Sequence, residues 1–278
     1  MRIARIGERG AEVPVAAGAD GAWRDLRPLG ADVTGEWLAG GLGELDIDGL
    51  EVWQGPPGRF GPPLARVGKL VCVGLNYRDH AAETGAEIPP EPVLFLKAGD
   101  TVVGPDDEVL IPRGSTKTDW EVELAVVIGS TARYLASPED SLGHIAGYAI
   151  SNDVSEREFQ IERAGQWDKG KNCETFNPLG PWIVTPDEVP DPQRLGLRLW
   201  VNGTLRQDGK TAQMAYGVAY LVWYVSQFMV LHPGDVLNTG TPAGVALGRA
   251  DHPYLRAGDV VEVEIDGLGR QRQTIGQA

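Results

Sequence analysis

Short apolar runs, separated by turns rich in glycine and proline, dominate the chain after about residue 68. Lys69–Gly74 is too short for a helix and rich in β-branched residues, so it predicts a buried strand. Trp120–Ile128 is apolar almost throughout from Leu124 onward, as in a strand buried on both faces. Asn202-Gly203 and Asp266-Gly267 are dipeptides typical of hairpin turns. The same pattern predicts strands at Pro92–Lys97, Glu108–Ile111, Ala146–Asn152, Leu197–Val201, Thr204–Gln207, Asp235–Asn238 and Val260–Ile265.

Helical spacing is confined to a few short segments. Tyr216–Met229 has apolar residues at helical spacing, and Pro233-Gly234 follows just beyond it. Arg78–Thr84 has helical propensity for one or two turns before Pro89-Pro90, and Glu156–Arg163 is a third candidate. Strands therefore dominate without regular alternation with helices, which favours a β-rich α+β fold over a doubly wound sheet.

The first part of the chain predicts a small N-terminal domain. Val13–Val15 is a candidate strand and Asp32–Leu42 a candidate short helix. Gln54–Pro63 then excludes regular structure, because its prolines and glycines interrupt both helices and strands. We therefore divide the chain into a small domain, 1–66, and a larger domain, 67–278.

Composition excludes several classes of function. The 25 Lys and Arg against 39 Asp and Glu give a formal charge of −14 without a basic stripe, so we expect no nucleic-acid partner. No window approaches the roughly 20 apolar residues of a membrane span, so we expect no membrane protein. The N-terminus lacks the apolar region of a secretory signal. Cys72 and Cys173 are too few for a disulfide framework or a thiolate zinc site, which predicts a cytoplasmic location.

Two carboxylates interrupt the most apolar strand. Glu121 and Glu123 are two residues apart, so a strand places both side chains on one face. Adjacent carboxylates repel and are costly to bury unless a cation neutralises them, and oxygen ligands favour Mg²⁺, Mn²⁺ or Ca²⁺ over Zn²⁺. Asp153, at the end of the apolar run Ile145–Ile150, is the best candidate for a third ligand. The spacing alone is equally compatible with a solvated strand end.

Three other segments carry candidate chemistry. His80 and Glu83 lie one helical turn apart, so the carboxylate could orient the imidazole as a general base, although a surface pair is the commoner outcome. Thr239–Val245 could present backbone N–H groups to a carboxylate or oxyanion, or could be an ordinary turn. Lys169–Lys171 could bind substrate or lie in a solvated loop.

Taken together and in this order, six segments within residues 68–270 resemble the fumarylacetoacetate hydrolase family. They are GLNYRDHAAE at 74–83, EPVLFLK at 91–97, DWEVELAVVIG at 119–129, SNDVSERE at 151–158, GKNCETFNPLGPW at 170–182 and GDVLNTGTPAGV at 234–245. Each segment is weak alone, but their shared order makes the resemblance specific. It implies a mixed β-roll in the larger domain, a homodimer, and one Mg²⁺ or Mn²⁺ ion, with Ca²⁺ also compatible in crystals.

The resemblance also implies roles for individual residues. The family's metal ligands correspond to Glu121, Glu123 and Asp153. Its catalytic residues, including a water-activating dyad on a short lid helix, correspond to His80, Glu83 and Lys171. Its substrate-facing positions correspond to Lys97, Arg157, Gln160 and Thr241.

The activity that the resemblance implies is hydrolysis of a carbon–carbon bond in an acylpyruvate (a 2,4-dioxo acid) to pyruvate and a carboxylic acid. The metal would polarise the 2-oxo carbonyl, His80 with Glu83 would deprotonate water, and Lys171 would stabilise the oxyanion. The segments look most like the branch that acts on 2,4-dioxo-3-deoxy-L-fuconate or -rhamnonate. Two alternatives stay open. One is oxaloacetate decarboxylation or keto–enol tautomerisation at the same metal site; the other is a non-catalytic ligand-binding protein.

Overall fold

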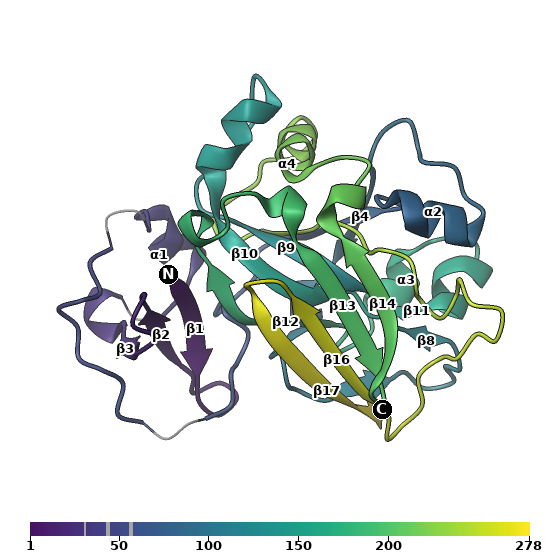
Figure 1. Ribbon diagram of the computed structural model, residues 1–278, viewed down its shortest axis with the longest axis horizontal. Helices are drawn as coiled ribbons and strands as arrows, with labels where there is room; N and C mark the ends of the chain where they lie inside the picture. The colour runs from purple at the N-terminus through teal and green to yellow at the C-terminus, as the bar shows by residue number, and fades with distance from the viewer. Residues whose placement is uncertain (31, 43–44, 56–57) are drawn as a thin grey trace.

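The computed structural model describes residues 1–278 except residues 31, 43, 44, 56 and 57. Strands greatly outnumber α-helices, so the predicted β-rich α+β class is confirmed (Figure 1). The strands are Arg2–Ile6 (β1), Val13–Ala17 (β2), Trp23–Asp25 (β3), Leu70–Gly74 (β4), Val93–Lys97 (β5), Val102–Val103 (β6), Val109–Ile111 (β7), Thr118–Asp119 (β8), Val122–Ile128 (β9), Ile145–Asn152 (β10), Ser155–Glu156 (β11), Asn177–Val184 (β12), Gly196–Val201 (β13), Thr204–Lys210 (β14), Val236–Asn238 (β15), Val260–Ile265 (β16) and Gly269–Gln277 (β17). The α-helices are Gly35–Ala39 (α1), Arg78–Thr84 (α2), Asp168–Lys171 (α3) and Val218–Ser226 (α4), and Glu158–Glu162 (η4) is a short π-helical turn. Short 3₁₀ helices lie at Arg27–Leu29 (η1), Gly99–Thr101 (η2), Pro138–His144 (η3), Pro186–Glu188 (η5), Pro192–Arg194 (η6) and Thr211–Gln213 (η7).

The strands form one large and one smaller mixed sheet. The large sheet runs β3-β2-β1-β12-β10-β9-β15-β4-β5, and β6 pairs with β12. Most neighbours in it are antiparallel, but β15 and β4 are parallel, as are β6 and β12. The smaller sheet runs β14-β13-β16-β17-β7, and β8 pairs with β11 in a separate two-stranded ribbon. The hairpins β13–β14 and β16–β17 confirm the two predicted hairpin turns.

Strand β9 lies at the centre of the molecule with both faces buried, as its apolar sequence predicts. Leu124 and Val126 belong to the core that β13 and β16 share. Ala125 and Val127 point to the opposite face and belong to a second core, shared with β1 and α1. The central strand is therefore held by packing on both faces, and this packing fixes the position of the residues at its start.

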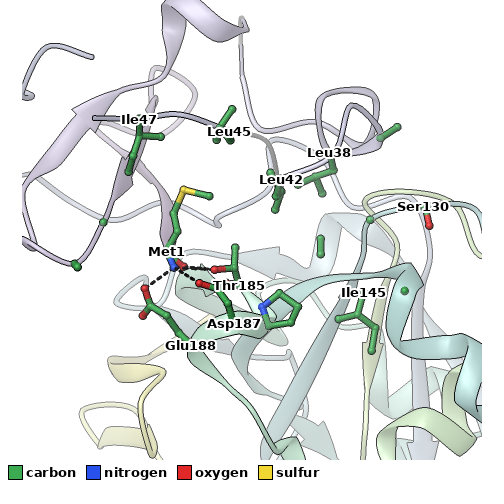
Figure 2. A pocket seen from close by; sticks show the side chains of 18 residues that line it. Met1, Leu38, Leu42, Leu45, Ile47, Ser130, Ile145, Thr185, Asp187 and Glu188 are labelled. Carbon is green, nitrogen blue, oxygen red and sulfur yellow. Dashed lines mark hydrogen bonds and ion pairs between the residues drawn. The ribbon is translucent and has the colours of Figure 1, made fainter. Parts of the chain in front are cut away.

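The N-terminal strands extend the large sheet. β1 pairs with β12 through Arg2 and Ile3, and β1 to β3 lie on the opposite side of the molecule from α2 and α3 (Figure 1). A cavity of about 870 Å³ lies between this region and the sheet (Figure 2), and its apolar lining includes Leu38, Leu42, Leu45, Ile47 and Ile145. At one side the amino group of Met1 donates to Thr185 Oγ1 at 2.7 Å and pairs with Glu188. The division after residue 66 stays a prediction.

Several predicted boundaries were wrong. Helix α4 starts at Val218 rather than Tyr216, because Gly217 has an extended backbone, and it ends at Ser226 rather than Met229. Strand β9 starts at Val122 rather than Trp120, because Asn152 Oδ1 rather than a strand carbonyl accepts from the Glu121 N–H. The helix predicted at Glu156–Arg163 is the shorter turn η4.

The predicted linker is irregular apart from an isolated bridge at Phe60, and its residues 56 and 57 lie outside the described residues. Cys72 and Cys173 are both free. Among the residues that the structure describes, none of the helices has the length and apolarity to cross a membrane.

Candidate active site

Antiparallel pairing of β9 and β10 brings the three predicted metal ligands together. Ser151 of β10 pairs with Glu123 of β9. Two residues farther along, the Asp153 N–H donates to the carbonyl oxygen of Glu121, just before β9, at 2.9 Å. The start of β9 therefore lies beside the end of β10. All three carboxylates are buried, and each offers an oxygen within 4.8 Å of the others.

Three cationic side chains neutralise most of this negative charge. Lys171 Nζ donates to Glu121 Oε2 at 2.7 Å and to Asp153 Oδ2 at 2.6 Å. Lys97 Nζ lies 2.5 Å from Asp153 Oδ1, and Arg157 Nη2 lies 2.7 Å from Glu121 Oε1. Burial opposes the ionisation of Glu121, but Lys171 and Arg157 outweigh it and lower its pKa to about 2. Burial likewise opposes the charge on Lys171, but Asp153 and Glu121 raise its pKa.

Glu123 is the member of the triad that has no cationic partner in the described part of the chain. Its Oε2 accepts a 2.7 Å hydrogen bond from Gly240 N–H. Burial, followed by the charges of Asp153 and Glu121, raises the pKa of Glu123 well above its usual range. Ionisation of Glu123 would therefore be favoured by a further positive charge beside it. A hard divalent cation fits this donor set, because the set consists of carboxylate oxygens without sulfur or nitrogen.

Helix α2 carries the predicted dyad. His80 is 8% exposed, and its Nδ1 lies 3.5 Å from Glu83 Oε2, which is ion-pair range but longer than a hydrogen bond. Both oxygens of Glu83 accept from the Gly244 N–H, at 2.9 and 3.0 Å. Gly85 ends the helix in the left-handed region, with φ of 67°. The structure thus brings the pair together, and Glu83 also ties α2 to the loop that follows β15.

Thr241 lies in that loop and lines the site. Its hydroxyl donates to Val122 O at 2.9 Å and accepts from Gln207 Nε2 at 2.8 Å. Because the hydroxyl is engaged within the protein, contact with a ligand falls to the backbone or methyl group. The preceding Gly240 has φ of 94°, and a Cβ there would lie 2.9 Å from Asn76 Cβ, so the turn requires glycine.

Asp119 is a residue of this site that the sequence analysis did not single out. It is fully buried, and its Oδ2 accepts from Arg157 Nε at 2.8 Å and from Leu247 N–H at 3.0 Å. Its Oδ1 accepts from Ala246 N–H at 2.7 Å. Arg157 in turn donates to Gln160 Oε1 at 3.0 Å. One carboxylate therefore fixes both an arginine of the site and the loop after β15.

The sequence does contain a signal for Asp119. It precedes Glu121 by the same two residues that separate Glu121 from Glu123, so one alternation contains three acidic residues. An acidic side chain at the start of such a buried strand is itself expected to be buried, so it needs hydrogen-bond donors from within the protein.

The predicted site residues converge on one cavity of about 280 Å³. Those that line it are His80, Glu121, Glu123, Asp153, Arg157, Gln160, Lys171 and Thr241. Lys97 and Glu83 contact this lining through Asp153 and His80. The rest of the lining is mainly apolar and includes Val73, Leu75, Phe95, Ile161, Trp167 and Leu247. The arrangement can hold a cation and an anionic ligand beside an imidazole.

Comparison with known proteins identifies the family. The sequence profile described as "Fumarylacetoacetate (FAA) hydrolase C-terminal" matches residues 69–276. This chain belongs to the fumarylacetoacetate hydrolase family. The predicted family and its mixed-sheet fold are therefore confirmed, and the protein is a member of a hydrolase family.

Individual relatives of the family extend over the whole chain. The 2,4-didehydro-3-deoxy-L-rhamnonate hydrolase of Sphingomonas sp. (strain SKA58) is 49% identical over 278 residues, covering 100% of this chain and 96% of that protein. The solved fumarylacetoacetate hydrolase of psychrophilic Exiguobacterium antarcticum is 36% identical, with a TM-score of 0.88 and 100% of both chains covered. The solved 2-hydroxyhepta-2,4-diene-1,7-dioate isomerase of Mycobacterium marinum is 33% identical, with a TM-score of 0.78 and coverage of 100% and 98%.

Proposed function

We propose that this protein hydrolyses a carbon–carbon bond in an acylpyruvate, with a divalent cation, Mg²⁺ or Mn²⁺, held by Glu121, Glu123 and Asp153. The observation that supports this most strongly is the convergence of three buried carboxylates, His80 and Lys171 on one small cavity. The reaction adds one water across the bond between C3 and C4. The acyl carbon gains OH and becomes a carboxylate with loss of H⁺, while C3 gains H and becomes the methyl group of pyruvate.

The substrate that we propose is 2,4-dioxo-3-deoxy-L-rhamnonate, supported by the 49% identical relative named for that compound. Its cleavage would give pyruvate and lactate. The fuconate alternative is the same molecule, because the two oxo groups and the deoxy position leave C5 as the sole stereocentre, and the L-series fixes C5. The sequence branch and the relative's name therefore agree on one six-carbon substrate.

The chain's own residues divide the chemistry among them. When bound, the cation would polarise the 2-oxo carbonyl of the substrate. His80 accepts a proton from the attacking water, and Glu83, 3.5 Å from Nδ1, stabilises the resulting imidazolium. Lys171 donates to the oxyanion that develops at C4. Arg157, fixed by Asp119, holds the oxygens of the substrate, and the buried site limits access of bulk water.

Release of pyruvate tests the proposal. Purified protein should release pyruvate from 2,4-dioxopentanoate and from 2,4-dioxo-3-deoxy-L-rhamnonate; EDTA should abolish the release and added Mn²⁺ restore it. His80→Gln should lower kcat by about 10²–10⁴-fold, because the general base is lost. His144→Gln is the matched control, since His144 bonds to Ser130 away from this cavity. Absence of pyruvate from every acylpyruvate in a panel would contradict the proposal and favour a ligand-binding role.

The second candidate is oxaloacetate decarboxylation or keto–enol tautomerisation at the same site. The similar solved structure that is named as an isomerase favours this candidate. Decarboxylation needs no activated water, so His80→Ala should spare it while abolishing acylpyruvate hydrolysis. Equal loss of both activities would contradict the assignment of His80 as the water base.

On the family resemblance we also propose a homodimer.

A further inference from the structure

The 280 Å³ cavity has a charged half and an apolar half, and a series of contacts leads from one to the other. Lys171 Nζ, which bonds to Glu121 and Asp153, lies 5.1 Å from the centroid of the Phe95 ring. Phe95 in turn packs edge-on against Trp167, with 5.7 Å between ring centroids. Phe95 and Trp167 therefore form a continuous aromatic part of the lining beside Lys171.

The position of Trp167 is fixed by the strand beneath it. Gly74 ends β4, and a Cβ at that position would lie 2.3 Å from Trp167 Cζ3. The indole therefore packs directly on the backbone of a strand in the large sheet, where no other residue type than glycine leaves room for it. A side chain held in this way forms a rigid wall rather than an adaptable one.

The cations of the lining are already paired at the charged half. Arg157 bonds to Asp119 and Glu121, and Lys171 bonds to Glu121 and Asp153. Among the described residues that line the cavity, no further Lys or Arg lies on the side of Trp167. A carboxylate placed against these rings would lose part of its hydration without gaining a cationic partner, which is unfavourable.

From this geometry we propose that the site selects acylpyruvates whose acyl end is short and uncharged, and that Trp167 with Phe95 is the wall which contacts that end. The inference rests on the proposed function, because the 2-oxo acid end has to occupy the charged half. A volume of about 280 Å³ is consistent with a ligand smaller than a drug-sized molecule. The site would reject a dicarboxylate of the kind that the Mycobacterium marinum protein is named for.

A matched pair of substrates isolates the effect of charge. The compounds 2,4-dioxoheptanoate and 2,4-dioxoheptanedioate share one seven-carbon chain and differ only in a terminal methyl or carboxylate group. We expect kcat/KM to favour the monocarboxylate by at least about tenfold. Dissociation constants measured by calorimetry with Mn²⁺ present should favour it in the same direction.

Variants of Ile161, at the exposed edge of the cavity, and of Trp167, in its wall, test which residues determine the selectivity. Ile161 lines the cavity and is 47% exposed, so Ile161→Lys introduces a cation that folding should tolerate. It should shift the substrate ratio several-fold toward the dioate, whereas the uncharged Ile161→Gln should keep the wild-type ratio. Trp167→Ala should raise KM more than it lowers kcat, and more for 2,4-dioxoheptanoate than for 2,4-dioxopentanoate, because the longer acyl group reaches the wall.

These outcomes distinguish failure of the proposed selectivity from failure of the proposed hydrolysis. Equal or better use and binding of the dioate by the wild-type protein overturns the inference but leaves the proposed hydrolysis intact. Turnover of neither compound nor of 2,4-dioxopentanoate overturns the proposed hydrolysis, and the calorimetric ratio then decides the inference independently. A Trp167→Ala effect of the same size for both acyl lengths removes Trp167 from the wall.

Discussion

Two cavities in the described part of this protein differ in size and in the burial of the charged groups that line them. The larger one, about 870 Å³, has a mainly apolar lining, and the Asp187 side chain at its edge is 76% exposed (Figure 2). The smaller one, about 280 Å³, contains the carboxylates of Glu121, Glu123 and Asp153, all buried. Burying a charged group costs stability, so buried charged groups are found preferentially where they serve a function. Buried, paired charge is therefore a better reason than volume for choosing the smaller cavity as the candidate active site.

The largest expected difference comes from removing one carboxylate from each cavity. Asp153→Asn leaves Lys97 and Lys171 with one fewer buried anion each and removes a proposed metal ligand. We expect kcat/KM to fall by roughly 10³-fold or more and the free energy of unfolding to fall by about 3–5 kcal/mol. Enzyme kinetics and urea unfolding measure the two effects.

The matched change in the larger cavity is Asp187→Asn. Because that side chain is mostly exposed, both quantities should stay within experimental error of the wild type. A comparable loss of activity in Asp187→Asn would mean that the larger cavity also serves the reaction, and the contrast between the two cavities would fail.

A second pair of variants compares two arginine–carboxylate pairs, one fully buried and one partly buried. Asp119→Asn weakens the hold on Arg157, and we expect kcat/KM to fall by about 10–100-fold, mainly through KM, because a residue behind the site is lost. The matched variant is Asp32→Asn, which weakens the pair of Asp32 with Arg5 in the N-terminal region. It should lower the free energy of unfolding without changing kcat/KM. On an Arg157→Gln background, Asp119→Asn should have little further effect; a full additional loss would show that Asp119 acts independently of Arg157.

The smallest expected effect concerns the N-terminal region outside both cavities. Burial opposes the ionisation of Glu12 and of Asp107, but hydrogen bonds from Arg59 outweigh it and lower the pKa of each carboxyl. Groups with a lowered folded pKa contribute stability above their unfolded pKa, and this contribution is lost as pH falls through the folded pKa. Arg59→Gln should therefore destabilise the protein by about 1 kcal/mol or less at pH 6, and by less at pH 3. Urea unfolding at both pH values tests this, and an effect that grows on acidification would contradict the assignment.

Much of the site could be predicted because its residues are placed by strands. The spacing of Glu121 and Glu123 gives a shared face in any strand, and Asp153 follows directly after the strand that pairs with theirs. Glu83 shows the limit of that reasoning. Helical spacing predicts its nearness to His80, but its hydrogen bonds to Gly244 depend on a loop far along the chain, which no local pattern encodes.

The fold was least predictable where a strand departs from the usual composition. β12 contains Pro178, Gly180 and Pro181, which are typical of turns and sheet edges, so the sequence pattern gave no strand there. In the structure β12 lies between β1 and β10, and it pairs with β6 at one end and with β1 at the other. The ladder with β10 is irregular between Tyr148 and Ile150, so the residues without an N–H need not satisfy a continuous set of bonds.

The register of β9 against β10 limits which insertions and deletions this chain can accept. Ser151 faces Glu123 and Asn152 faces Val122 along the ladder. Inserting or deleting a single residue in either strand would turn the acidic side chains toward the opposite core and leave leucine and valine where they stood. Surface loops of descendants are free to lengthen and shorten, whereas these two strands can accept substitution but not a change in length.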